Sequence, residues 1–137
     1  GEEYSIDVFV TDNGDILSVV PRLRIEVRAG EVSKSITKNN KELINLTMAL
    51  VKKLGITGPA TIQGIRESQS GKFYFIEVNP RFGGGVPLTI EAGIPYADFI
   101  KPTYSYEKGK LMSFKSELMM LRYDEALFIT QEGSGIF

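Results

Sequence analysis

Three oxygen-bearing side chains on two neighbouring segments could together hold a hard cation. Glu77 and Asn79 lie two positions apart in residues 73–81, whose composition is typical of a β-strand, so their side chains share a face. Gln63 lies in residues 58–66, a second strand-like run that would complete a hairpin. One carboxylate and two amide oxygens suit Mg²⁺ or Mn²⁺, with phosphate oxygens and water as further ligands. A calcium cage would need more carboxylates than this set provides. We therefore expect a metal that arrives with a nucleotide.

The register of this hairpin decides whether the three side chains meet. A turn centred near Ser70 pairs positions whose numbers sum to 140, which sets Gln63 opposite Glu77 and Ile65 opposite Phe75. Glu77 taken alone is equally well explained as a surface acid on an edge strand. The combination of the three side chains favours a site.

Arg81 follows the proposed ligands, and Pro80 fixes the backbone between them. Its planar guanidinium suits a phosphate group. Residues 82–85, Phe-Gly-Gly-Gly, form a loop with little side-chain bulk, although three glycines also fit a plain flexible turn. The loop is neither a P-loop, because the following Lys-Ser/Thr is missing, nor a G-x-G-x-x-G fingerprint. Residues 86–92 then read as a short helix that ends at Gly93.

Composition narrows the chemistry further. The 137 residues predict one domain, and 16 Lys+Arg against 17 Asp+Glu give a net charge of −1, which disfavours binding to nucleic acid or an anionic membrane. The chain has no cysteine and no histidine, which excludes thiolate nucleophiles, Ser-His-Asp triads and metal sites built on imidazole or sulfur. Apolar stretches are too short to span a bilayer and no basic signal peptide opens the sequence, so a soluble, cytoplasmic chain is expected.

The elements that must position these residues begin with a hairpin of residues 4–10 and 16–20. Asn13-Gly14 favours a two-residue type I′ turn, which sets Asp12 opposite Asp15, pairs positions whose numbers sum to 27 and so places Val10 opposite Leu17. One face is then apolar, with Tyr4, Ile6, Val8 and Val10 on the first strand. The other carries Glu3 opposite Arg24, Ser5 opposite Arg22 and Asp7 opposite Val20. We interpret that second face as solvated, with cross-strand ion pairs.

Helical periodicity appears over residues 40–54, after a turn at 29–31 and a short strand at 32–36. Asn39 or Asn40 is the candidate N-cap, and Gly55 marks the end. The apolar stripe that would cover the sheet consists of Leu43, Leu46, Met48, Leu50, Val51 and Leu54.

Further elements are predicted near the C-terminus. Residues 96–100 suggest a short helix and residues 118–121 and 126–130 two strands, with a linker near 102–109. Three tyrosines could stack on nucleic-acid bases, but without a basic patch around them we expect core or rim packing: Tyr104, Tyr106 and Tyr123.

Two motifs at matched spacing carry a family resemblance. Glu77-Val78-Asn79-Pro80-Arg81 resembles the E-x-N-P-R signature of the ATP-grasp superfamily. Residues 58–63 resemble the G-x-x-x-x-Q strand of carbamoyl-phosphate-synthase large chains, and residues 1–8 resemble the strand that opens the second ATP-grasp subdomain. The resemblance covers residues 1–100 and implies an α+β domain, an antiparallel β-sheet with helices packed on one face. Residues 101–137 would be a C-terminal extension packing on the same domain.

The resemblance also implies roles for individual residues. It implies that three side chains coordinate an Mg²⁺ or Mn²⁺ ion, which in turn bridges the ATP phosphates: Gln63, Glu77 and Asn79. Arg81 would stabilise the phosphoryl group in transfer, and Arg28 would be a second basic residue near the phosphates. Glu3 matches an acid that contacts the nucleotide ribose.

The implied enzyme is an ATP-dependent ligase that binds Mg-ATP, converts a small carboxylate to an acylphosphate and lets an amine or another nucleophile attack it. Residues 82–86 resemble carboxylate–amine ligases more than true carbamoyl phosphate synthases, which carry serine and arginine there. The chain looks like the C-terminal half of the ATP-binding unit, deficient in catalysis without the N-terminal half, and uncovered apolar surface would favour a homo-oligomer. The alternative is a non-catalytic binding or interface module of a larger assembly.

Overall fold

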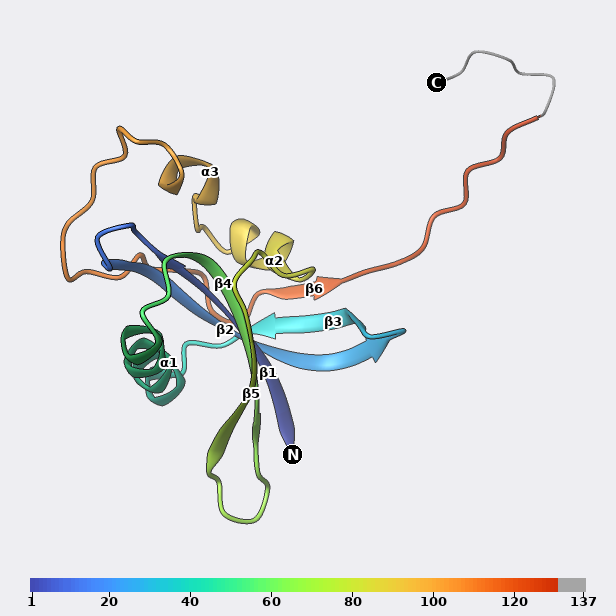
Figure 1. The fold of residues 1–137 in the computed structure, drawn as a ribbon. Helices are drawn as coiled ribbons and strands as arrows, with labels where there is room; N and C mark the ends of the chain where they lie inside the picture. The colour runs from blue at the N-terminus through green and yellow to red at the C-terminus, as the bar shows by residue number, and fades with distance from the viewer. Residues whose placement is uncertain (131–137) are drawn as a thin grey trace.

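The computed structural model describes residues 1–130. Six strands form one antiparallel sheet in the order β5-β4-β1-β2-β3-β6, which confirms the predicted α+β class (Figure 1). The elements along the chain are β1 (Glu2–Val10), β2 (Ile16–Arg28), β3 (Glu31–Thr37), α1 (Lys41–Leu54), β4 (Gly58–Arg66), β5 (Phe73–Asn79), α2 (Val86–Glu91), α3 (Tyr96–Phe99) and β6 (Met119–Leu121).

Alternation along β1 builds a core on each face of the sheet. Ile6 and Val8 point to one face, where they pack with Leu43 and Val51 of α1. Phe9 points to the other, where it packs with Tyr96 and Phe99 around α3. The helices were predicted on one face; instead α2 and α3 cover part of the face opposite α1 (Figure 1). The sheet is therefore a middle layer.

The first hairpin follows the predicted register up to its last pair. Residues that sum to 27 pair as far as Phe9 with Ser18, but Val10 pairs with Ile16 rather than Leu17. The connection is not a two-residue type I′ turn: the Gly14 amide donates to the Thr11 carbonyl (2.9 Å) and Gly14 has a φ of 86°. A turn followed by a left-handed glycine inserts a residue into the ladder and shifts the register there.

Capping fixes both ends of α1. The Asn40 side chain accepts a hydrogen bond from the Leu43 amide (3.1 Å), and Gly55 ends the helix at a φ of 65°. The stripe that faces the sheet differs from the predicted one, because its fully buried members are Leu43, Thr47 and Val51. Leu46 and Leu54, predicted to be core residues, are 40% and 54% exposed, because the helix buries the face that carries Leu43, Thr47 and Val51.

An irregularity in the second hairpin changes which way β5 faces. Gln63 pairs with Glu77 as predicted, but Gly64 pairs with Phe75, so β5 holds the extra residue Ile76 between the two pairs. The predicted pairing of Ile65 with Phe75 is therefore wrong; Ile65 pairs with Tyr74. Such a β-bulge turns the following residues to the opposite face.

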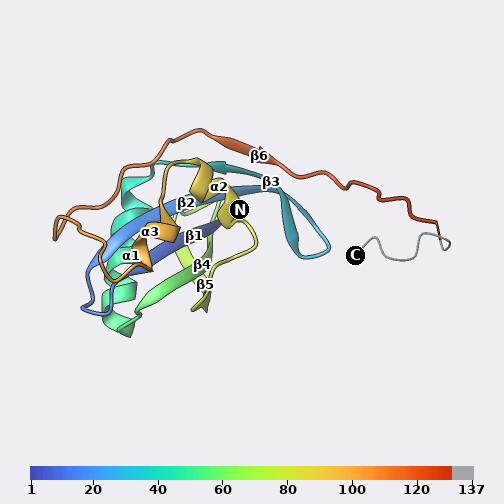
Figure 2. The same ribbon diagram turned by 90° about the horizontal axis from the view of Figure 1, so that it is seen from above.

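The C-terminal part adds the edge strand β6 to the sheet and then leaves it. β6 pairs with β3, which confirms a strand near residues 118–121, whereas residues 126–130 form no strand and run away from the body in both views (Figures 1 and 2). No sheet edge lies beside them to supply backbone partners. Tyr104 and Tyr106 are half-buried beside the second core as expected, but Tyr123 is exposed. Of the predicted extension, residues 131–137 lie outside the described part. Among the described residues, no helix has the length and apolar character needed to cross a membrane.

Loss of the helix cap should lower stability without changing the fold. Asn40→Ala removes the acceptor for the Leu43 amide, so we expect the free energy of unfolding to fall by about 1 kcal/mol. Asn39→Ala is the matched control, since the Asn39 side chain is exposed and makes no hydrogen bond within residues 1–130. Urea denaturation measures both. Equal losses for the two variants would contradict the assignment of the cap.

Candidate functional site

A polar pocket of about 390 Å³ opens on the face of the sheet that carries α2 and α3. Strands β1, β2, β4 and β5 form its floor, and the β2–β3 turn and the glycine loop before α2 form its walls. Its charged lining consists of Arg22, Arg24, Arg81, Arg122 and a single acid, Glu31. Such an excess of guanidinium groups is suited to an anionic ligand.

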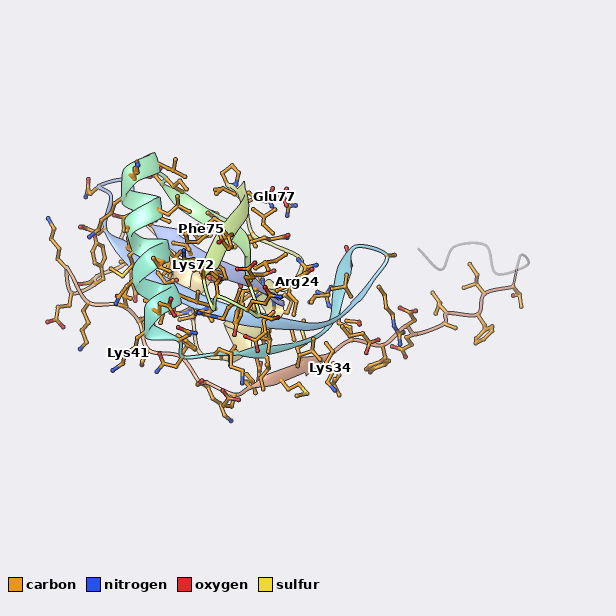
Figure 3. The ribbon with its side chains drawn as sticks, turned by 90° about the horizontal axis from the view of Figure 1, so that it is seen from below. Arg24, Lys34, Lys41, Lys72, Phe75 and Glu77 are labelled. Carbon is orange, nitrogen blue, oxygen red and sulfur yellow. The ribbon has the colours of Figure 1, made fainter. Side chains whose placement is uncertain are left out.

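The structure brings three of the six predicted site residues to this pocket. Gln63 on β4, Asn79 at the end of β5 and Arg81 just beyond it all line the pocket. Glu77 is exposed on β5 at the edge of the sheet and does not line the pocket, although it pairs directly with Gln63 (Figure 3). Within residues 1–130 the side chains of Gln63, Glu77 and Asn79 make no hydrogen bond or ion pair, which leaves their oxygens free for a ligand.

Arg81 is anchored by its backbone and free at its head group. The Arg81 side chain is exposed, and Nη1 donates only to the neighbouring Phe82 carbonyl (3.0 Å). The Arg81 carbonyl accepts a hydrogen bond from Thr61 Oγ1 (3.1 Å) on β4. The guanidinium has no carboxylate partner in the described part of the chain and can therefore meet an anion.

Two residues predicted near the nucleotide lie outside the pocket. Arg28 is exposed on the β2–β3 hairpin and donates to Glu26 Oε1 (3.1 Å). Glu3 is exposed at the start of β1, with its carboxylate 3.7 Å from Arg24 Nε, which confirms the expected cross-strand pair. The structure thus does not bring Glu3 or Arg28 together with Gln63 and Asn79.

The polar face of the first hairpin, predicted to be solvated, is instead buried beside the pocket. Asp7 is 2% and Arg22 1% exposed, and two hydrogen bonds join them, Nε to Oδ2 at 2.8 Å and Nη2 to Oδ1 at 2.9 Å. Thr89 of α2 donates to the same carboxylate. The prediction failed because α2 and α3 cover this face; Phe9 and Val20, apolar residues on it, were the available signal.

Sequence reasoning did not assign three pocket arginines to the site: it placed Arg22 and Arg24 on a solvated face and did not single out Arg122. Arg24 follows Arg22 on β2, and Arg122 reaches the pocket directly after β6, where it donates to the Gly84 carbonyl and lies 3.5 Å from Glu31. No local motif marks Arg122, because only the pairing of β6 with β3 brings it to the glycine loop. Arg24 could have been found, because it lies two positions after Arg22 on the same strand and therefore shares its face.

Solved structures similar to this chain belong to ATP-grasp enzymes, which identifies the fold. A biotin carboxylase–β-γ-ATP complex from Campylobacter jejuni matches 86% of this chain with a TM-score of 0.68 at 18% identity. N5-carboxyaminoimidazole synthetase from Staphylococcus aureus complexed with ADP matches 66% with a TM-score of 0.52 at 20% identity. The chain spans only 28% and 25% of those two proteins.

The particular family follows from the sequence of residues 1–122. They match the model of the family described as ATP-grasp in the biosynthetic pathway with Ter operon, and the chain belongs to that family. A curated relative, acetyl-CoA carboxylase 2 of Oryza sativa subsp. japonica, is 31% identical over 83 residues, which are 58% of this chain and 4% of that protein. The chain is thus similar to a small part of much longer proteins.

A side chain added at Gly85 should disrupt the site from within. A Cβ there would overlap the Arg22 guanidinium, so Gly85→Ala must shift either the glycine loop or the guanidinium that pairs with Asp7. Because overpacking a filled, buried site is destabilising, we expect the free energy of unfolding to fall by about 2 kcal/mol. A Cβ at Gly84 would meet nothing within 4 Å, so Gly84→Ala should stay within about 0.5 kcal/mol. Denaturant titration compares them, and a Gly85→Ala protein as stable as the parent would refute the close contact.

Proposed function

We propose that this chain is the C-terminal part of the ATP-binding unit of an ATP-dependent ligase that activates a carboxylate as an acylphosphate. The observation that carries the proposal is the convergence of Gln63, Asn79 and Arg81 on one arginine-lined pocket, with Glu77 opposite Gln63 in the strand register. Membership of the ATP-grasp family supports it. A nucleophile such as an amine would then attack the acylphosphate.

The donor set fits Mg²⁺ or Mn²⁺. Gln63, Glu77 and Asn79 would hold the ion through one carboxylate and two amide oxygens, none of them engaged elsewhere in residues 1–130. When bound, the metal would offset the negative charge of the ATP phosphates. A similar structure, a biotin carboxylase domain from Hydrogenobacter thermophilus, was solved with MgADP and bicarbonate, which supports ATP and magnesium as ligands here.

Arg81 and Arg28 would neutralise the part of the phosphate charge that the metal leaves uncompensated. Arg81 offers its unpaired guanidinium to the phosphoryl group in transfer, where a planar fork can donate two parallel hydrogen bonds to phosphate oxygens. Arg28 precedes the pocket-lining residues Ala29 and Gly30, and we keep it as a second basic residue toward the phosphates. Glu3 remains our proposal for the ribose contact. No protein nucleophile is needed, in keeping with a sequence that has no cysteine or histidine.

The substrate class we propose is a small carboxylate and an amine. The similar proteins named above are carboxylases and a carboxyaminoimidazole synthetase, so the carboxylate–amine ligase chemistry is favoured over carbamoyl phosphate synthesis. The complete enzyme would need the N-terminal half of the ATP-binding unit, and use of ATP agrees with a cytoplasmic location. We place the boundary between the subdomain and its C-terminal extension near residue 100.

Removal of the one carboxylate in the ligand set should impair the chemistry and spare the fold. In the complete enzyme, Glu77→Gln should lower turnover by about 10²-fold, because a neutral amide holds a hard cation poorly at the phosphates. The unfolding transition should not move, since Glu77 is exposed. Gln63→Ala should be milder, and Arg81→Lys should also slow turnover. Steady-state assays at several Mg²⁺ concentrations measure these effects.

The matched control is Glu91→Gln, an exposed acid at the end of α2 that makes no ion pair in the described residues. It should leave turnover unchanged. A Glu77→Gln enzyme with normal turnover and an unchanged Mg²⁺ requirement would contradict the proposed ligand set.

Residues 1–137 alone should fold but bind Mg-ATP weakly, because only the phosphate and metal side of the site is present. Isothermal titration calorimetry on the isolated chain and on the complete enzyme tests this, with the complete enzyme binding more tightly. Micromolar or tighter binding by the isolated chain would contradict the need for an N-terminal half. Tight binding by the complete enzyme without turnover on any carboxylate would favour the non-catalytic module.

A further inference from the structure

The glycine loop at residues 82–85 rests on two side chains of the sheet. Thr61 Oγ1 lies 3.1 Å from the Arg81 carbonyl oxygen. A Cβ added at Gly83 would lie 2.7 Å from Thr61 Oγ1. The Gly83 backbone therefore packs directly on Thr61. Gly85 packs in the same way on the Arg22 guanidinium.

Both supporting side chains lie beside Asp7. Its carboxylate accepts two hydrogen bonds from Arg22 and one from Thr89, and Thr61 Oγ1 lies 3.4 Å away. A threonine hydroxyl has a single proton, and the Arg81 carbonyl is the nearer acceptor. The carboxylate is already satisfied by charged and neutral donors, so the geometry directs the Thr61 proton to Arg81.

We propose that Thr61 is a positioning residue for Arg81: its hydroxyl holds the Arg81 backbone, and with it the glycine loop, at the pocket. This inference rests on the proposed function of Arg81 as a phosphate-binding group. The exposed Arg81 guanidinium has no ion pair to hold it, so the direction of its side chain depends on the backbone from which it leaves. In residues 1–130, Thr61 supplies the side-chain hydrogen bond to the Arg81 backbone.

Two substitutions at Thr61 distinguish the role of its hydroxyl group from that of its volume. Thr61 is 5% exposed, so Thr61→Val keeps the shape against Gly83 and removes the donor to Arg81. Thr61→Ser keeps the donor and loses only a methyl group. A residue that served packing alone would respond to these two changes in the opposite order.

The test measures binding of Mg-ADP to the complete enzyme by calorimetry, with turnover as a second readout. We expect Thr61→Val to weaken binding about tenfold, the usual effect of one lost hydrogen bond. Thr61→Ser should stay within about threefold of the parent, because its hydroxyl still reaches the Arg81 carbonyl. Normal binding by Thr61→Val would overturn the inference.

Two further variants keep the result decisive. Asn40→Ala loses stability on the opposite face of the sheet and should bind Mg-ADP normally; a loss equal to that of Thr61→Val would overturn the inference, since stability alone would then explain it. If Thr61→Val does not fold, Gly83→Ala takes its place, because the added methyl pushes the loop off Thr61 and should weaken binding by the same mechanism. Unchanged binding by Gly83→Ala would count against the proposal.

Arg81→Lys separates this inference from the proposed function. If Arg81→Lys and Glu77→Gln both bind Mg-ADP and turn over normally, the proposed function fails. If either is impaired while Thr61→Val is normal, the proposed function stands and the positioning role of Thr61 is refuted.

Discussion

A carboxylate and a guanidinium withdrawn from water are stable only as a pair, because either group alone would carry an uncompensated charge in a medium of low dielectric constant. Asp7 and Arg22 meet this condition with two short hydrogen bonds between β1 and β2. Thr89 brings α2 to the same carboxylate, and Gly85 lies against the guanidinium. The face of the sheet that carries the pocket is organised around this ion pair.

The same pair sets the charge of the pocket. Arg22 contributes to the floor of the pocket, but its charge is balanced by Asp7, and Arg122 lies 3.5 Å from Glu31. The guanidinium of Arg81 is the one that faces the pocket without a carboxylate close by in residues 1–130. The excess positive charge is therefore concentrated where Gln63 and Asn79 also lie.

Local signals in the sequence predicted the parts of the fold that depend on local chemistry. The side chain of Asn40 and the left-handed Gly55 define α1, and the pairing of Gln63 with Glu77 follows from hairpin register. The burial of Asp7 could not be predicted in this way, because it depends on where two short helices pack. The place of Arg122 in the pocket could not be predicted for a related reason, because the pairing of β6 with β3 brings it there from a distant part of the sequence.

The register errors have one physical cause, the insertion of single residues into otherwise regular ladders. Val10 pairs with Ile16 because the first turn is longer than a type I′ turn, and Phe75 pairs with Gly64 because β5 holds an extra residue. Alternation rules assume an unbroken strand, so they place Phe75 and Glu77 on the same face. In the structure Phe75 packs against the core under α1, whereas Asn79, of the same parity, lines the pocket on the other side.

Ile76 therefore matters through its backbone rather than its side chain, which is 63% exposed. As the extra residue of the bulge, it lets one short strand deliver aromatic rings to the hydrophobic core and then the side chain of Asn79 to the pocket on the opposite face. The number of residues in β5 is thus as much a part of the site as their identity. A related chain could keep every motif residue and yet lose the site through a single deletion, which conservation of the signature alone would not reveal.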